Sequence, residues 1–156
     1  MSWDQLHRDC RALASRLQRA GPFYAIVTTS NGGLVVAAIV ARELNIQTIE
    51  TLCMSSQGES GPEEEPKILK KVADEVAAIA GGAGQGVLII DDVATNSTVE
   101  VVRSMLPKAH VAAVYTRPIS RSLVDTFITE VSTHSSIYLP WETAVAFQPP
   151  IHEDGS

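Results

Sequence analysis

Hydrophobic residues recur along the chain at two spacings, and the two spacings alternate. Apolar residues that repeat every third or fourth position indicate helices with one buried face, whereas short continuous apolar runs indicate buried strands. The predicted helices cover Trp3 to Leu17, Leu34 to Leu44, Lys67 to Ala80 and Val99 to Leu106, and the predicted strands cover Phe23 to Thr28, Ile46 to Met54, Val87 to Ile90 and Val111 to Tyr115. The chain from Pro118 onward is expected to be irregular, with short strands such as Ile137 to Leu139.

Alternating strands and helices predict an α/β fold, in which a mainly parallel sheet carries helices on both faces. No repeat or second domain is visible, so residues 1–156 are expected to form one domain. In such sheets, ligands bind beyond the carboxyl ends of the strands. Three segments follow predicted strands and are candidate site loops: Ser30–Gly33, which we expect to be a turn, Ser55–Pro66 and Asp91–Thr98. The length and polarity of residues 55–66 predict a mobile lid.

Composition narrows the range of partners. Hydrophobic residues make up 45% of the 156 positions and charged residues 19%, which suits a packed core. The formal net charge of -6 argues against nucleic acid or an anionic membrane surface as the main partner. The longest apolar run, Leu34 to Ala41, is too short to span a bilayer. Cys10 and Cys53 are too few for a disulfide framework or a four-ligand metal site, so we expect a cytoplasmic protein.

The strongest chemical signal is an apolar strand that ends in two adjacent carboxylates, Asp91 and Asp92, before a polar turn opens a helix. Backbone N–H groups at such a helix start, together with hydroxyls of the turn, can bind a phosphate. The carboxylates can accept hydrogen bonds from sugar hydroxyls or hold Mg²⁺. A phosphorylated sugar satisfies both halves of this site. The alternative is structural, because Asp92 with Thr95 or Asn96 could simply cap the helix.

This strand, acidic pair and turn resemble the phosphoribosyl-pyrophosphate (PRPP) loop of type I phosphoribosyltransferases, and the chain is most similar to the bacterial members that act on xanthine and guanine. The matching stretches run in order from about Trp3 to Ile151 and include Ser30-x-Gly32-Gly33-Leu34-Val35, Ala41-Arg42-Glu43-Leu44-x-Ile46, Cys53-x-Ser55-Ser56, Ile90-Asp91-Asp92, Pro107-Lys108-Ala109-His110 and Pro140-Trp141. The resemblance implies the type I phosphoribosyltransferase fold, a twisted, mainly parallel sheet flanked by helices, with a small irregular C-terminal hood. It also implies transfer of phosphoribose from PRPP to a purine base, with Mg²⁺ on the pyrophosphate.

The same resemblance implies roles for individual residues. Asp91 and Asp92 match the catalytic acidic pair that binds ribose and, through Asp92, magnesium. Further matches are the 5′-phosphate cup of Thr95, Asn96, Ser97 and Thr98, the pyrophosphate loop of Asn31, Gly32 and Gly33, and the base-binding residues Arg117, Ser136 and Ile137. The pyrophosphate loop often has a strained peptide, which glycines would tolerate. Residues 55–66 match a lid, residues 117–151 match the base-recognition region and tail, and the family suggests a homotetramer.

The chain departs from the family pattern at several of these positions. The family's loop has a third Asp, the usual general acid/base candidate, which is missing from this shorter turn. Asn31 replaces an Arg, Arg117 replaces a Lys that contacts the exocyclic oxygen of the purine, and Ser136 replaces the aromatic residue that stacks on it. Two functions stay open: a phosphoribosyltransferase acting on xanthine, guanine or hypoxanthine, and a catalytically degenerate member that binds a purine nucleotide as a regulatory module. Transfer to a different base or nucleophile is a third possibility.

Overall fold

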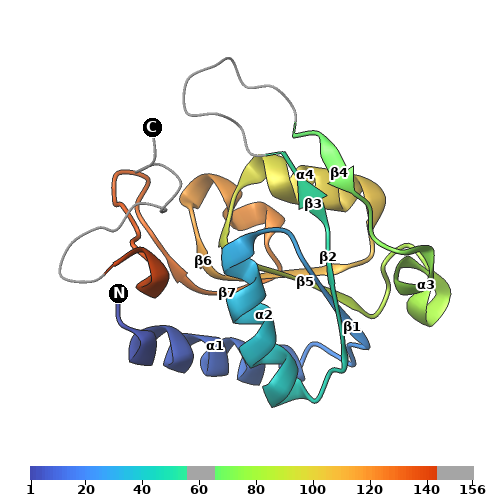
Figure 1. The fold of residues 1–156 in the computed structure, drawn as a ribbon, viewed down its shortest axis with the longest axis horizontal. Helices are drawn as coiled ribbons and strands as arrows, with labels where there is room; N and C mark the ends of the chain where they lie inside the picture. The colour runs from blue at the N-terminus through green and yellow to red at the C-terminus, as the bar shows by residue number, and fades with distance from the viewer. Residues whose placement is uncertain (56–65, 144–156) are drawn as a thin grey trace, which may run out of the picture.

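The computed structural model of the protein describes residues 1–55 and 66–143, and a five-stranded sheet forms its centre (Figure 1). The strands lie in the order β2 (Thr48–Thr51), β1 (Ala25–Thr28), β5 (Val87–Ala94), β6 (His110–Thr116) and β7 (Thr126–Glu130). Every pairing between neighbouring strands of this sheet is parallel. The predicted α/β class and mainly parallel sheet are confirmed.

Helices cover both faces of the sheet (Figure 1). They are α1 (Trp3–Gln18), α2 (Asn31–Leu44), α3 (Asp74–Ala77) and α4 (Asn96–Met105). α1 and α2 pack on one face, whereas α3 and α4 pack on the other. Alternate side chains of β5 point to opposite faces, so Leu88 and Ile90 join the core under α1 and α2, while Val87 and Ile89 join the core under α4. None of the described helices combines the length and apolar character that crossing a bilayer requires.

The connection from β1 to α2 is short and is fixed by a helix cap. Ser30 is the N-cap of α2, and its hydroxyl accepts a hydrogen bond from the N–H of Gly33 at 2.8 Å. α2 therefore begins at Asn31 rather than at Leu34, and the expected separate turn at Ser30–Gly33 is its first helical turn. This cap places the start of α2 directly beyond the carboxyl end of β1.

A two-stranded antiparallel ribbon, β3 (Cys53–Met54) and β4 (Ile68–Lys70), lies beyond the edge strand β2 (Figure 1). The predicted helix from Lys67 to Ala80 is wrong, because its first residues pair with β3 and only α3 and the 3-10 turn η1 (Ile79–Gly81) are helical. The Glu50 carboxylate accepts hydrogen bonds from Lys70 Nζ at 3.0 Å and from the Ala73 N–H at 2.8 Å, which holds this stretch extended along the sheet edge. Residues 56–65 of the expected lid lie outside the described residues.

Two predicted strands differ in extent from those observed. The strand predicted for Ile46 to Met54 is divided at Leu52 into β2 and β3. The N–H of Leu52 donates to Thr28 O at 2.9 Å, and β2 ends one residue before Leu52. The strand predicted to end at Ile90 continues through the acidic pair, since β5 pairs with β6 as far as Ala94.

The described residues after Pro118 hold one strand, and it does not lie at Ile137 to Leu139. β7 completes the sheet and is followed by an irregular segment that ends in the 3-10 turn η3 (Pro140–Glu142). Residues Ile137 to Leu139 are not a strand, because Ile137 and Leu139 pack into the core as single side chains without strand pairing. The irregular hood is confirmed for the described residues, and residues 144–156 lie outside them.

Candidate functional site

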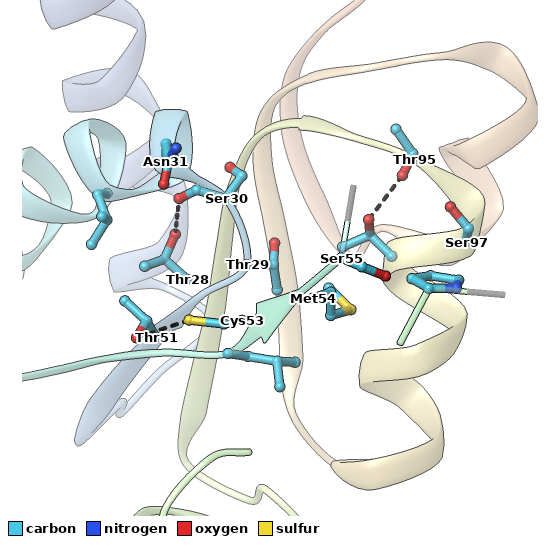
Figure 2. Close-up of a pocket in the computed structure, with 14 residues that line it drawn as sticks. Thr28, Thr29, Ser30, Asn31, Thr51, Cys53, Met54, Ser55, Thr95 and Ser97 are labelled. Atoms are coloured by element: carbon cyan, nitrogen blue, oxygen red, sulfur yellow. Dashed lines mark hydrogen bonds between the residues drawn. The ribbon is translucent and has the colours of Figure 1, made fainter. Parts of the chain in front are cut away.

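A cavity of about 690 Å³ opens at the carboxyl edge of the sheet (Figure 2). Its walls come from the end of β1 with the start of α2, from the chain that leaves β2, and from the start of α4. Most of its 14 described lining residues carry a hydroxyl group, and none of these residues is charged. The position agrees with the rule that ligands of parallel sheets bind beyond the strand ends.

The start of α4 supplies one wall of the cavity. Thr95 is the N-cap of this helix, and its hydroxyl donates to the hydroxyl of Thr98 at 3.0 Å instead of capping the backbone (Figure 2). The first N–H groups of α4 are thus free of side-chain caps and carry the positive end of the helix dipole. Thr95, Ser97 and Thr98 line the cavity, whereas Asn96 does not, and its side-chain oxygen is buried without a partner among the described residues. Three of the four predicted phosphate-cup residues therefore share one wall.

The acidic pair lies behind the opposite wall. Asp91 is 6% exposed, and its carboxylate accepts hydrogen bonds from Ser30 Oγ at 2.7 Å, Thr29 Oγ1 at 3.1 Å and the N–H of Asp92 at 2.9 Å. Burial and the neighbouring Asp92 carboxylate raise the pKa of Asp91 well above its ordinary value. Asp92 is half-buried, and its Oδ1 accepts from Ser30 Oγ at 3.2 Å and from the N–H of Val93 at 2.8 Å. Neither carboxylate is among the described residues that line the cavity.

The two glycines of the predicted pyrophosphate loop serve close packing. A Cβ at Gly32 would lie 1.9 Å from Asp92 Oδ2, and one at Gly33 would lie 2.3 Å from Thr28 Oγ1. Neither glycine has a positive φ, and the cis peptide found in the described residues lies at Gly21-Pro22. The expected strained peptide is therefore absent from this loop. Of the loop residues, Asn31 is exposed and lines the cavity.

The three predicted base-binding residues lie at the neighbouring edge, beyond β6 and β7. Arg117 directly follows β6, and its Nη1 donates to the carbonyl oxygens of Ser132 and Ser135. Ser136 is exposed, and Ile137 is half-buried against the core. None of the three is among the described residues of the cavity wall.

Several site residues were missed by the sequence analysis. Thr28, Thr29 and Thr51 give the cavity hydroxyl groups, and the half-buried Cys53 also lines it. The available signal was position, because β1 and β2 both end in threonine. Threonine is so common in strands that this signal is weak on its own.

Magnesium fits these residues in a limited way. Among the described residues, no group of three or more His, Cys, Asp or Glu side chains could hold a metal ion. Mg²⁺ is usually bound through one or two carboxylates and completes its shell with water and substrate phosphates. Asp92 offers one partly exposed carboxylate beside the start of α2, which is compatible with an ion that arrives with its phosphate ligand.

The fold and the cavity together define an α/β protein with an open cavity at the strand ends, between two helix starts. Comparison with known proteins makes this specific. A family model described as the phosphoribosyl transferase domain matches residues 2–148. The chain is also 47% identical over 152 residues to a xanthine-guanine phosphoribosyltransferase from Nitratidesulfovibrio vulgaris, covering 97% of this chain and 88% of that protein.

Solved structures give the same result. A purine phosphoribosyltransferase from Pyrococcus horikoshii superposes with a TM-score of 0.71 and 25% identity, covering 96% of this chain and 97% of that one. A Neisseria gonorrhoeae protein with bound ppGpp superposes with a TM-score of 0.68 and 22% identity over 93% of this chain and 89% of that one, which supports the fold alone. The chain belongs to the phosphoribosyl transferase family, and the predicted type I fold and resemblance are confirmed.

Proposed function

We propose that this protein is a purine phosphoribosyltransferase that transfers the 5-phosphoribosyl group of PRPP to xanthine, guanine or hypoxanthine and releases pyrophosphate. The observation that carries the proposal is the hydroxyl-lined cavity between the starts of α2 and α4, with the acidic pair directly behind it. The 47% identity to a xanthine-guanine phosphoribosyltransferase supports the choice of base.

In this proposal, each helix start binds one of the two phosphorylated ends of the substrate. The N–H groups of α4 with the hydroxyls of Thr95, Ser97 and Thr98 take the 5′-phosphate. The start of α2 at Asn31, Gly32 and Gly33 takes the pyrophosphate. Since the described cavity wall holds no basic side chain, helix dipoles and backbone donors supply its positive potential.

The two residues of the acidic pair have different roles in this proposal. The Asp91 carboxylate is occupied by Thr29 and Ser30, so it holds the β1–α2 connection in place. The less buried Asp92 is the residue that accepts hydrogen bonds from the ribose hydroxyls and contacts magnesium. When bound, Mg²⁺ neutralises charge on the pyrophosphate.

The reaction breaks the bond between C1′ and the pyrophosphate oxygen, whose electron pair leaves with the pyrophosphate, and forms a bond from a purine nitrogen to C1′, while the proton of that nitrogen passes to solvent water. The chain offers little acid/base chemistry beside this step, because Val93 and Ala94 stand where the turn could have carried another carboxylate. Catalysis in this proposal comes from positioning and from stabilising the leaving group.

The direct test incubates the purified chain with PRPP, Mg²⁺ and one base at a time and measures nucleoside monophosphate and pyrophosphate together. We expect product from at least one of xanthine, guanine and hypoxanthine. Asp92→Asn keeps the shape of the side chain but loses its charge, and should lower turnover at least about a hundredfold. Absence of product from every purine would reject the proposal.

A second candidate is a nucleotide-binding module without transferase activity. It is favoured by the internal hydrogen bonds of Asp91 and by the missing third Asp, which together leave the site with few groups for chemistry. This candidate predicts calorimetric binding of a purine nucleotide without turnover. A kcat/KM of about 10⁴ M⁻¹s⁻¹ or more would exclude it.

The remaining parts of the proposal concern the whole protein. Residues 1–156 act as one domain, residues 55–66 close over PRPP as a lid, and residues 117–151 recognise the base. We propose a homotetramer that works in the cytoplasm, where the free thiols of Cys10 and Cys53 are compatible with reducing conditions.

A further inference from the structure

The segment after β7 forms a tight turn that is held by a side chain from another strand. The N–H of Ser135 donates to Ser132 O at 3.0 Å, which closes the turn at residues 132–135. Arg117 Nη1 donates to the same Ser132 oxygen and to Ser135 O at 2.7 Å. One guanidinium nitrogen thus joins the first and last carbonyl groups of the turn.

Arg117 has no carboxylate partner among the described residues, so these two carbonyl groups are the acceptors that the structure gives its charge. Hydrogen bonds from an ionised donor are roughly twice as strong as neutral ones. The backbone at Arg117 is also held by the sheet. Arg117 directly follows β6, and the last residue of β6, Thr116, accepts a hydrogen bond from the N–H of Val131 at 2.9 Å. The ends of β6 and β7 and the turn therefore form one connected unit.

The chain beyond this turn leads toward the acidic pair. Ile137 packs on the core, and Leu139 is 5% exposed within it. Trp141 then reaches α2, where a Cβ built on Gly32 would lie 2.9 Å from its Cζ2 atom. The segment from 132 to 141 thus runs from the Arg117 clamp to the start of α2, and Ser136 and Ile137 lie between these two ends in the sequence.

We infer that Arg117 is a positioning residue, which clamps the turn at residues 132–135 and so fixes Ser136 and Ile137 for the base, and that it does not bind the base itself. This inference rests on the proposed function. Nη1 has two N–H groups and donates to two carbonyl oxygens, so this nitrogen has no donor left for an exocyclic oxygen of a purine, and the turn holds the side chain in place. Discrimination between bases then depends on the backbone that follows the turn.

The first test measures hydrogen exchange across the intact chain. Arg117→Met removes the donors and keeps most of the aliphatic stem, so amides of residues 132–137 should exchange at least about tenfold faster than in the wild type. Arg117→Lys keeps the charge and one donor nitrogen and should restore part of the protection. The matched control is Arg121→Met, because Arg121 lies on the nearby 3-10 turn η2 (Pro118–Leu123) with a 65% exposed side chain that pairs with Glu130 and lies over the Phe127 ring, both on β7. Unchanged exchange in Arg117→Met would overturn the inference.

The second test separates positioning from contact by using the bases themselves. A positioning role predicts that Arg117→Met raises KM for xanthine, guanine and hypoxanthine by similar factors, with KM for PRPP within about twofold of the wild type. Adenine, which has an amino group in place of the exocyclic oxygen, should remain as poor a substrate as before. A tenfold gain for adenine relative to hypoxanthine would instead reveal direct contact and overturn the inference. If the wild type forms no product, the proposed function fails, and the exchange experiment alone decides the role of Arg117.

Discussion

Gly32 lies against the carboxylate of Asp92, so close that a Cβ at position 32 would be 1.9 Å from Asp92 Oδ2. The same Cβ would be 2.9 Å from Trp141 Cζ2. Position 32 is therefore where the start of α2, the end of β5 and the C-terminal 3-10 turn meet. A missing side chain brings together the segments that we propose for pyrophosphate, ribose and the base.

Gly32→Ala tests whether this contact matters. Helix propensity alone would make the variant about 0.5–1 kcal/mol more stable, because alanine costs less backbone entropy than glycine inside a helix. The contact with Asp92 predicts the opposite sign, a loss of about 1–3 kcal/mol from overpacking, together with weaker binding of PRPP. Urea unfolding and calorimetry measure the two effects.

The matched control for this prediction is a double-mutant cycle. Asp92→Ala removes the carboxylate that the new Cβ would meet, so Gly32→Ala should cost less stability in the Asp92→Ala background than in the wild type. Equal costs in both backgrounds would mean that Asp92 is not the group that excludes a side chain at position 32.

The two cysteines should react very differently with iodoacetamide. Burial, with a smaller effect from Asp9, raises the pKa of the Cys10 thiol to about 12, and Cys10 is 0% exposed. Cys53 is half-buried and lines the cavity. Because the thiolate is the reactive form, we expect alkylation of Cys53 while Cys10 stays unmodified in the folded protein at pH 8.

Substrate protection places the Cys53 reaction in the site. Saturating PRPP with Mg²⁺ should slow alkylation of Cys53 at least about fivefold, because the ligand would occupy the cavity that the thiol lines. Cys53→Ser supplies the control, in which peptide mass spectrometry should find no modified position. Alkylation at an unchanged rate in the presence of bound PRPP would contradict the proposed position of the ligand.

The sequence predicted the frame of this fold better than its irregular parts. The strand at residues 87–90 and the helix from Trp3 follow from burial periodicity, which the structure repeats in the two cores on either side of β5. The helix predicted from Lys67 failed at its start because the spacing of apolar residues does not reflect burial there: Ile68, the first residue of that spacing, is 37% exposed and its backbone pairs with β3. Pairing partners of this kind are set by contacts distant in sequence, which periodicity does not contain.

The candidate site likewise has features that the sequence predicts and features that it does not. The position of the start of α4 at the cavity could be predicted because a helix start after a strand is a local feature, and Thr95, Ser97 and Thr98 do line the cavity. The internal bonding of Asp91 and the clamp by Arg117 could not, since their partners lie 61 residues away at Ser30 and 15 residues away at Ser132. The residue type alone indicates that Asp91 accepts hydrogen bonds and that Arg117 donates them. Only the fold shows which partners form those hydrogen bonds.

Tryptophan fluorescence should report ligand binding at position 141. The chain has two tryptophans, and their ring centroids lie 6.0 Å apart, with Trp141 also touching Gly32. In Trp3→Phe, the remaining indole lies beside the proposed pyrophosphate loop, so pyrophosphate with Mg²⁺ should change its emission in a saturable way. Trp141→Phe is the control and should respond at least about threefold less, because Trp3 lies one side chain further from the loop. A larger response in Trp141→Phe than in Trp3→Phe would contradict this arrangement.

Stability should depend on pH through His110, which begins β6 and whose ring contacts residues of two other segments. Nε2 is 2.8 Å from Thr126 Oγ1, and the ring centroid lies 5.3 Å from that of Phe23. Burial lowers the pKa of His110 from its usual 6.5; Arg103 acts in the same direction, whereas Asp125 opposes it. The folded state therefore binds fewer protons than the unfolded state just below this pH.

The sign follows directly from that difference in protons. The contribution of His110 is fully present above pH 6.5 and is lost as the pH falls toward and through its lower value in the folded protein. His110→Gln keeps a polar atom near Thr126 but cannot take up a proton, so the slope of unfolding free energy between about pH 7 and pH 5 should become flatter. His134→Gln is the matched control, because it makes the same replacement at an exposed histidine. Urea unfolding at each pH measures the slopes, and a slope as steep in His110→Gln as in the wild type would show that another group governs this range.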